Sequence, residues 1–98
     1  PDMFREMDFL SRMVRGLHQD SSAIDFHQVF KAATIYGARA LRIDQELGSL
    51  SVGKEASFLV IDLDSPNLTY VNDVVSAMVH RASTTDIRNI YIKGEKYL

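Results

Sequence analysis

Three histidines are the side chains of this sequence best suited to bind a metal ion or to carry a proton: His18, His27 and His80. Metal sites are usually indicated by short ligand spacings such as His-x-His or His-Glu-x-x-His, and none of the three has a second ligand at such a spacing. Cysteine, the other strong zinc ligand, is absent. We therefore expect the histidines to be solvated or packed as structural residues, and we expect no metal site within this chain.

Glu6 is a candidate for acid–base chemistry, because it falls within the apolar arc of a predicted helix at residues 3–17. A buried carboxylate at that position would have a raised pKa. The interpretation we favour is a residue at the rim of the arc, paired with Arg5 or Arg12. The hydroxyl side chains of residues 83–85 lack an accompanying His and acid pattern, so we predict a loop or cap there and no nucleophile.

Length and charge restrict the class of protein. The 98 residues suffice for one small domain or for part of a larger one. A net charge of −2 leaves no excess of Lys and Arg for nucleic-acid phosphates, and no apolar run approaches the roughly 20 residues that span a membrane. The lack of cysteine and of a leader segment favours the cytoplasm. Because the sequence begins at Pro1 and stops at Leu98 within a predicted strand, we expect an excerpt of a longer protein.

Two helices are predicted before residue 42. Over residues 3–17, apolar side chains recur at helical spacing, and the width of their stripe favours packing against a large apolar partner over an exposed binding surface of Met and Phe. A second helix is predicted over residues 25–37, continuing toward residue 41. Asp25 fits its N-cap, with Gln28 completing a capping box. Gly37 lies among alanines and indicates close packing.

The rest of the sequence predicts strands and one more helix. Residues 58–63 form a short apolar run typical of a buried strand. A helix capped by Asn72 or Asp73 follows. Residues 87–92 form a second strand, and residues 93–94 (Lys-Gly) fit a two-residue hairpin turn. The predicted order is therefore helix, helix, strand, helix and hairpin.

Four segments, in order, resemble motifs of the amidohydrolase superfamily. Residues 33–41 resemble its "AT-x-x-GA-x-x-L" helix, and residues 47–56 resemble its "G-x-(I/L)-x-x-G-K-x-A-D" motif, which a strand ending in Asp follows. Residues 90–95 are similar to its "V-x-V-(N/D)-G-K" hairpin. Residues 2–7 are similar to the "DMF-x-EM" segment of the branch that holds deaminases of S-adenosylhomocysteine, methylthioadenosine, guanine and cytosine and the triazine chlorohydrolases.

The sequence departs from these motifs at two positions. Ser57 stands where the family usually has Asp, and Lys93 stands where Asn is common in the hairpin turn. Lys tolerates a left-handed backbone less well than Asn does. We expect the role of both positions to be structural, so neither departure touches catalysis.

The resemblance implies a (β/α)8 barrel joined to a small β-sandwich built from both ends of the chain. Residues 1–46 would be the terminal barrel helices and residues 47–98 the C-terminal part of the sandwich, which makes the chain an α+β fragment. The parent protein would use Zn or Fe to hydrolyse a non-peptide C–N or C–Cl bond of a small heterocyclic substrate. All of its metal ligands would lie upstream, so this fragment would be scaffold. Asp2 and Met3, next to the barrel mouth, would be the substrate-proximal residues.

A stand-alone α+β interaction or assembly module without catalysis is the alternative. Both interpretations leave an apolar stripe and unpaired strands to be covered. We therefore expect either the remainder of the same polypeptide as partner, or self-association through Met7, Leu10, Val14 and the strand of residues 58–63.

Overall fold

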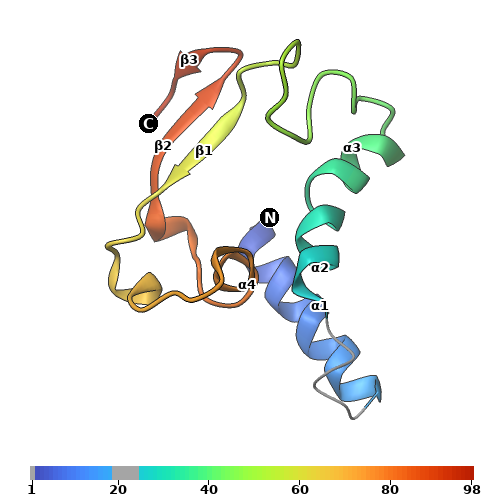
Figure 1. The fold of residues 1–98 in the computed structure, drawn as a ribbon, viewed down its shortest axis with the longest axis vertical. Helices are drawn as coiled ribbons and strands as arrows, with labels where there is room; N and C mark the ends of the chain where they lie inside the picture. The colour runs from blue at the N-terminus through green and yellow to red at the C-terminus, as the bar shows by residue number, and fades with distance from the viewer. Residues whose placement is uncertain (1, 19–24) are drawn as a thin grey trace.

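The computed structural model describes residues 2–18 and 25–98, with a helical layer at one end and a small sheet at the other (Figure 1). The order of elements agrees with the predicted order. The elements are α1 (Met3–His18), α2 (Phe26–Ala32), α3 (Ile35–Ala40), β1 (Phe58–Ile61), the 3₁₀ turn η2 (Pro66–Leu68), α4 (Val74–His80), the 3₁₀ turn η3 (Thr84–Asp86), β2 (Ile87–Ile92) and β3 (Glu95–Lys96).

The core lies where α1, α2 and α4 meet. Although α4 follows β1 in the chain, it packs against both earlier helices (Figure 1). Met7, Val29 and Val79, one from each helix, form one buried cluster, and phenylalanines from α1 and α2 surround it. A second cluster joins Leu68 of η2 to the apolar side of α4. Burial of these side chains from water is the main force that holds the helical layer together.

The apolar stripe of α1 is only half packed within this chain. Met7 is 6% exposed and Ser11 is fully buried, because α2 and α4 approach α1 from that side. The Ser11 hydroxyl donates to the Asp8 carbonyl at 2.7 Å, so its burial leaves no unsatisfied donor. Leu10 and Leu17, in contrast, are 41% and 76% exposed. The helix prediction is confirmed, whereas the described elements, in residues 2–18 and 25–98, pack against only part of the stripe.

The second predicted helix is interrupted. Asp25 caps α2 as predicted, accepting from the backbone N–H of His27 at 3.0 Å. The prediction of one helix over residues 25–37 is wrong, because α2 ends at Ala32 and a second helix, α3, begins at Ile35 after a turn at Thr34. The Thr34 hydroxyl donates to the Phe30 carbonyl at 2.9 Å and so competes for an acceptor that helix continuation would use. At Gly37 a Cβ would lie 3.0 Å from the Ala32 carbonyl oxygen, which explains the glycine there.

The sheet is antiparallel with the order β1-β2-β3. Phe58 pairs with Tyr91, and their rings stack at 4.8 Å. The predicted strand of residues 58–63 ends two residues early, because Asp62 accepts the N–H of Asp64 at 2.9 Å and turns the chain. The hairpin turn at residues 93–94 is confirmed by the positive φ of both residues, 52° and 83°.

The two departures from the family motifs lie in contact. The Ser57 hydroxyl accepts the backbone N–H of Lys93 at 3.0 Å and donates to a carboxylate oxygen of Glu55 at 3.3 Å. Ser57 therefore still supplies an acceptor to the hairpin turn, in agreement with the structural role expected for this position.

Asp86, a residue that is 1% exposed, joins the turn at η2 to the turn that leads into β2 through its carboxylate, and its backbone carbonyl accepts the N–H of Asp62 after β1. Its oxygens accept from the Ser65 hydroxyl, from the Ser83 N–H at 2.9 Å and from the Asn67 amide at 3.2 Å. Ser83 and Asp86 form a complete capping box, which confirms the predicted cap in residues 83–85. Burial acts to raise the pKa of Asp86, but these hydrogen bonds outweigh it and hold the pKa below its ordinary value.

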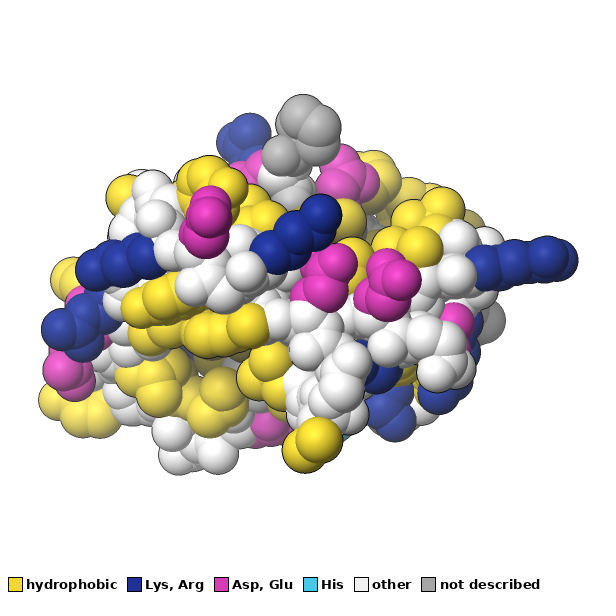
Figure 2. Space-filling view, turned by 90° about the horizontal axis from the view of Figure 1, so that it is seen from above, with side chains coloured by type: hydrophobic (Ala, Val, Ile, Leu, Met, Phe, Trp, Pro, Cys, Tyr) yellow, Lys and Arg dark blue, Asp and Glu magenta, His cyan; other side chains and the backbone are white. Residues whose placement is uncertain are grey.

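The accessible surface and the radius of gyration of the chain are both larger than those of a compact domain of the same size. Its accessible surface is 7153 Å², whereas a compact monomer of 11.1 kDa has about 5,700 Å². Its radius of gyration is 14.4 Å against about 13 Å for a compact domain of this length. In Figure 2, hydrophobic side chains cover much of the half of the visible face that contains the sheet. No helix in residues 2–18 or 25–98 is long and apolar enough to cross a membrane.

Candidate functional site

The two residues predicted to lie near substrate form the beginning of α1. The Asp2 carboxylate accepts the backbone N–H of Phe4 at 3.0 Å and that of Arg5 at 3.4 Å, so Asp2 caps the helix. Met3 is 56% exposed. A cap uses one carboxylate oxygen and fixes where α1 starts. The nearness of Asp2 and Met3 to substrate stays a prediction.

A network of charged side chains joins α1 to α4. His80 Nδ1 lies 3.2 Å from Asp8 Oδ1, and its Nε2 lies 3.1 Å from Arg15 Nη2. Arg12 Nε donates to the same Asp8 oxygen at 3.0 Å. Arginine only donates, and an ionised carboxylate only accepts. His80 therefore carries its proton on Nδ1, accepts on Nε2 and is neutral in this arrangement.

Asp8 is the anionic centre of this network. Partial burial acts to raise the pKa of its carboxyl group, but the hydrogen bonds from His80 and Arg12 outweigh burial and keep the pKa below the ordinary value. The ring of Phe26 packs on the His80 ring with the centroids 4.5 Å apart, which fixes the imidazole from the α2 side. The sequence predicted that His80 is a solvated or packed structural residue, but it did not reveal the partner, because Asp8 lies 72 residues away in the chain.

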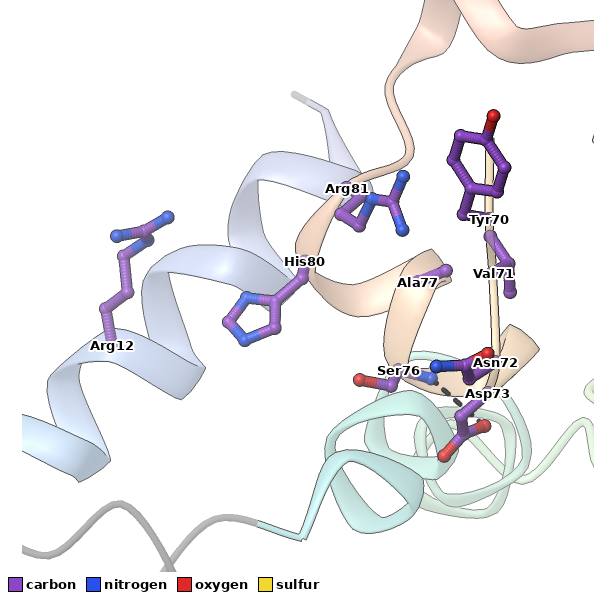
Figure 3. A pocket seen from close by; sticks show the side chains of 9 residues that line it. All are labelled: Arg12, Tyr70, Val71, Asn72, Asp73, Ser76, Ala77, His80 and Arg81. Atoms are coloured by element: carbon purple, nitrogen blue, oxygen red, sulfur yellow. Dashed lines mark hydrogen bonds between the residues drawn. The ribbon is translucent and has the colours of Figure 1, made fainter. Parts of the chain in front are cut away.

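An open depression lies beside this network (Figure 3). His80 projects between α1 and α4, with Arg12 on one side and Arg81 and Tyr70 on the other (Figure 3). Arg81 Nη2 donates to the Thr69 carbonyl at 2.7 Å. Both nitrogens of His80 are engaged by protein groups, so the depression has no free imidazole for a general base or a metal ligand.

The described residues do not fit a catalytic metal. Within residues 2–18 and 25–98, no three His, Cys, Asp or Glu side chains group closely enough to hold an ion. His27 is exposed and lies 3.7 Å from Asp73, a pair with no third ligand. The side chain of His18 lies outside the described part of the chain. Glu6 was predicted to pair with Arg5 or Arg12. Arg12 binds Asp8 instead, and the described residues show no ion pair of Glu6 with Arg5; Glu6 is exposed.

Comparisons with known proteins agree with the motifs. A model of the amidohydrolase family matches residues 1–96. The chain is 38% identical over 93 residues to a 5-methylthioadenosine/S-adenosylhomocysteine deaminase of Acetivibrio thermocellus, covering 95% of this chain and 22% of that protein. It is 35% identical over 94 residues to the enzyme of the same name from Thermoanaerobacter pseudethanolicus, covering 96% of this chain and 22% of the relative.

The fold also agrees with a solved structure. The crystal structure of an adenosine deaminase from Xanthomonas campestris with bound zinc matches with a TM-score of 0.91 and 29% identity, over 98% of this chain and 22% of that one. The chain therefore belongs to the amidohydrolase family. It spans about a fifth of the length of the curated relatives that it matches.

Proposed function

We propose that this chain is the C-terminal scaffold of a metal-dependent hydrolase that removes an amino group from a heterocyclic substrate of the 5-methylthioadenosine, S-adenosylhomocysteine or adenosine type. The observation that carries the proposal is the 38% identity to a 5-methylthioadenosine/S-adenosylhomocysteine deaminase across 95% of the chain. In such a reaction, water adds to the ring carbon that bears the amino group, and ammonia leaves. A chlorohydrolase, in which chloride leaves instead, is the variant within the same branch.

The metal ligands would lie in a part of the parent protein outside these 98 residues. The zinc in the Xanthomonas deaminase supports a metal-dependent parent, and we keep both zinc and iron as candidates. A bound metal of this kind supplies hydroxide at neutral pH. The residues of this chain would act on the reaction through α1, whose starting point is fixed by the Asp2 cap. Asp2 and Met3 would then be the residues of this chain closest to the substrate.

The test is an assay of the whole parent protein, loaded with zinc or with iron. Ammonia release from 5-methylthioadenosine, S-adenosylhomocysteine and adenosine would be measured, with chloride release from a chlorinated triazine alongside. We expect ammonia release that chelation abolishes and metal restores. Failure of every substrate in both metal-loaded forms would overturn the proposal. The separately expressed 98 residues should release neither product.

The competing function is a stand-alone interaction module. The family match and the unusually large accessible surface both favour a part of a larger enzyme. A small, cooperatively unfolding monomer of the 98 residues at high protein concentration would favour the module, because it would need no further chain to cover its apolar surface.

A further inference from the structure

The imidazole of His80 lies between a guanidinium that can only donate and a carboxylate that, when ionised, can only accept. Its Nε2 lies 3.1 Å from Arg15 Nη2, and its Nδ1 lies 3.2 Å from Asp8 Oδ1. Arginine has no acceptor and keeps its proton in proteins, so Nε2 must supply the lone pair of the first contact. The contact between Arg15 of α1 and His80 of α4 therefore requires a neutral imidazole.

This contact holds the Arg15 guanidinium against α4. The Nε atom of Arg15 is buried and has no hydrogen-bond partner among the described residues. The ion pairs within residues 2–18 and 25–98 involve Arg12, His27 and His80, and none of them includes Arg15. Loss of the lone pair on His80 Nε2 would therefore leave the guanidinium without an acceptor in this part of the chain.

Protonation of His80 removes that lone pair. Histidine is the side chain whose charge ordinarily changes between about pH 5 and 8. The added proton turns Nε2 into a donor that faces the donor of Arg15, and it places two cations side by side where the histidine side chain is only 24% exposed. At the same time the contact of Nδ1 with Asp8 becomes an ion pair. Protonated His80 thus keeps Asp8 as a partner and repels Arg15.

Asp8 keeps its negative charge through this pH range. Partial burial acts to raise the pKa of Asp8, but the hydrogen bonds from His80 and Arg12 outweigh it and keep the pKa below its ordinary value. Arg12 is the third cation of α1 at this junction, and its Nε donates to the Asp8 oxygen that also faces His80. The carboxylate is therefore available to a protonated His80.

The groups of α2 and α4 around the imidazole offer Arg15 no recorded alternative partner. From α2, the uncharged ring of Phe26 packs on the His80 ring, and His27 lies beside Asp73 instead. In Figure 3, the His80 ring projects between α1 and α4, while the Arg81 side chain lies toward the loop before α4, where it donates to a backbone carbonyl. The exchange of partners is thus confined to α1 and His80.

We propose that the junction of α1 and α4 contains a proton-dependent exchange of partners, in which protonation of His80 releases Arg15 from Nε2 and keeps Asp8 on Nδ1. Acidification then detaches α1 from α4 at Arg15, whereas the link at Asp8, two turns earlier in the helix, persists. The device follows from the hydrogen-bond geometry and does not depend on the reaction that the parent protein catalyses.

Crystals of the whole parent protein, transferred to about pH 8 and about pH 5, test the exchange directly. At the higher pH we expect the Arg15 guanidinium to lie on His80 Nε2. At the lower pH we expect it beyond hydrogen-bond distance, with the contact between His80 and Asp8 retained. A guanidinium that stays on Nε2 in acid would overturn the proposal, and so would loss of the Asp8 contact.

The competition between Arg15 and the proton can also be measured in solution. Hydrogen exchange at the imidazole C2 position, followed by mass spectrometry, reports the midpoint of His80 protonation in the parent protein. Because linkage is reciprocal, a proton that expels Arg15 must bind more easily once the guanidinium is gone. We expect Arg15→Gln to move the midpoint to higher pH by about half a unit or more.

Two further variants separate the charge at Arg15 from other effects. Arg15→Lys keeps a positive charge and should leave the midpoint close to that of the unsubstituted protein. Arg5→Gln is the matched control, because it removes a guanidinium from an exposed position of the same helix and should shift the midpoint little. Equal midpoints in Arg15→Gln and Arg5→Gln, or the same shift in Arg15→Lys as in Arg15→Gln, would contradict the proposed competition.

Discussion

Asp8 and Asp86 are two carboxylates that accept several hydrogen bonds, but they differ in burial and in the kind of donor that binds them. Asp86 is 1% exposed and is bound by neutral donors, namely two hydroxyls, an amide and a backbone N–H, most of them from neighbouring turns. The Asp8 side chain is 30% exposed and is bound by a guanidinium and an imidazole, the second from a helix 72 residues further along the chain. Both carboxyl groups have a lowered pKa.

The difference separates local from long-range stabilisation. Hydrogen bonds from neutral donors to a fully buried carboxylate act at short range and are not screened by salt. The interaction of a partly exposed carboxylate with a charged partner such as Arg12 is screened. The Asp86 site therefore fixes the turns that lead into β2. The Asp8 site ties α1 to α4 through His80, and its ion pair with Arg12 is the part that salt weakens. Four measurements follow from this comparison, in order of expected size.

Asp86→Asn should have the largest effect on stability. The substitution places a donor amide among donors and leaves them unpaired, so we expect a loss of about 3 kcal/mol in the free energy of unfolding. Urea denaturation of the parent protein measures it. Asp64→Asn, at an exposed position in the same turn, is the matched control and should change stability little. A loss at Asp86 no greater than the control would contradict the role assigned to the network.

Acid should remove the contribution of both carboxylates. Since the folded-state pKa of each lies below the ordinary 3.8, the stabilisation is present above pH 3.8 and is lost as the pH falls through the folded-state value. The stability difference between the parent protein and its Asp86→Asn variant should therefore shrink in acid. Adding salt at neutral pH should leave that difference unchanged. A difference that grows toward low pH would refute the assigned direction of the pKa.

The coupling of Asp8 to Arg12 should be smaller. In a double-mutant cycle with Asp8→Asn and Arg12→Gln, we expect a coupling of at most about 1 kcal/mol, because both side chains are partly exposed to solvent. Here added salt should reduce the coupling, in contrast with the Asp86 site. A coupling that is insensitive to salt would show that the two sites do not differ in the way proposed.

The hydrogen bond at Ser57 shows how much one such bond contributes to stability, for comparison with the two networks. Ser57→Ala removes one acceptor for the backbone N–H of Lys93 and should cost about 1 kcal/mol or less. Ser57→Asp restores an acceptor for the Lys93 N–H but places a second carboxylate beside Glu55, so it should recover part of the lost stability. Thermal denaturation distinguishes the variants, and an alanine variant as stable as the aspartate variant would show that the turn does not need the bond.

Local patterns in the sequence determined much of this fold. The Asp25 cap and the capped start of α4 at Asp73 depend on residues within three positions of each other. The hairpin turn at residues 93–94 is equally local. The family motifs could be recognised in the sequence because they too are short local patterns. The match of the amidohydrolase family model to residues 1–96 agrees with them.

Tertiary structure decided the rest. Thr34 has a normal place in a helical pattern, and only its bond to Phe30 in the folded chain shows why the helix breaks. The apolar stripe of α1 could not reveal which half α2 and α4 cover, because helical periodicity gives the angle between side chains and not the position of a neighbour. Asp8 and His80 meet across 72 residues, and no spacing rule reaches that far. Contacts of this kind depend on how elements pack, whereas caps and turns depend on the neighbouring residues alone.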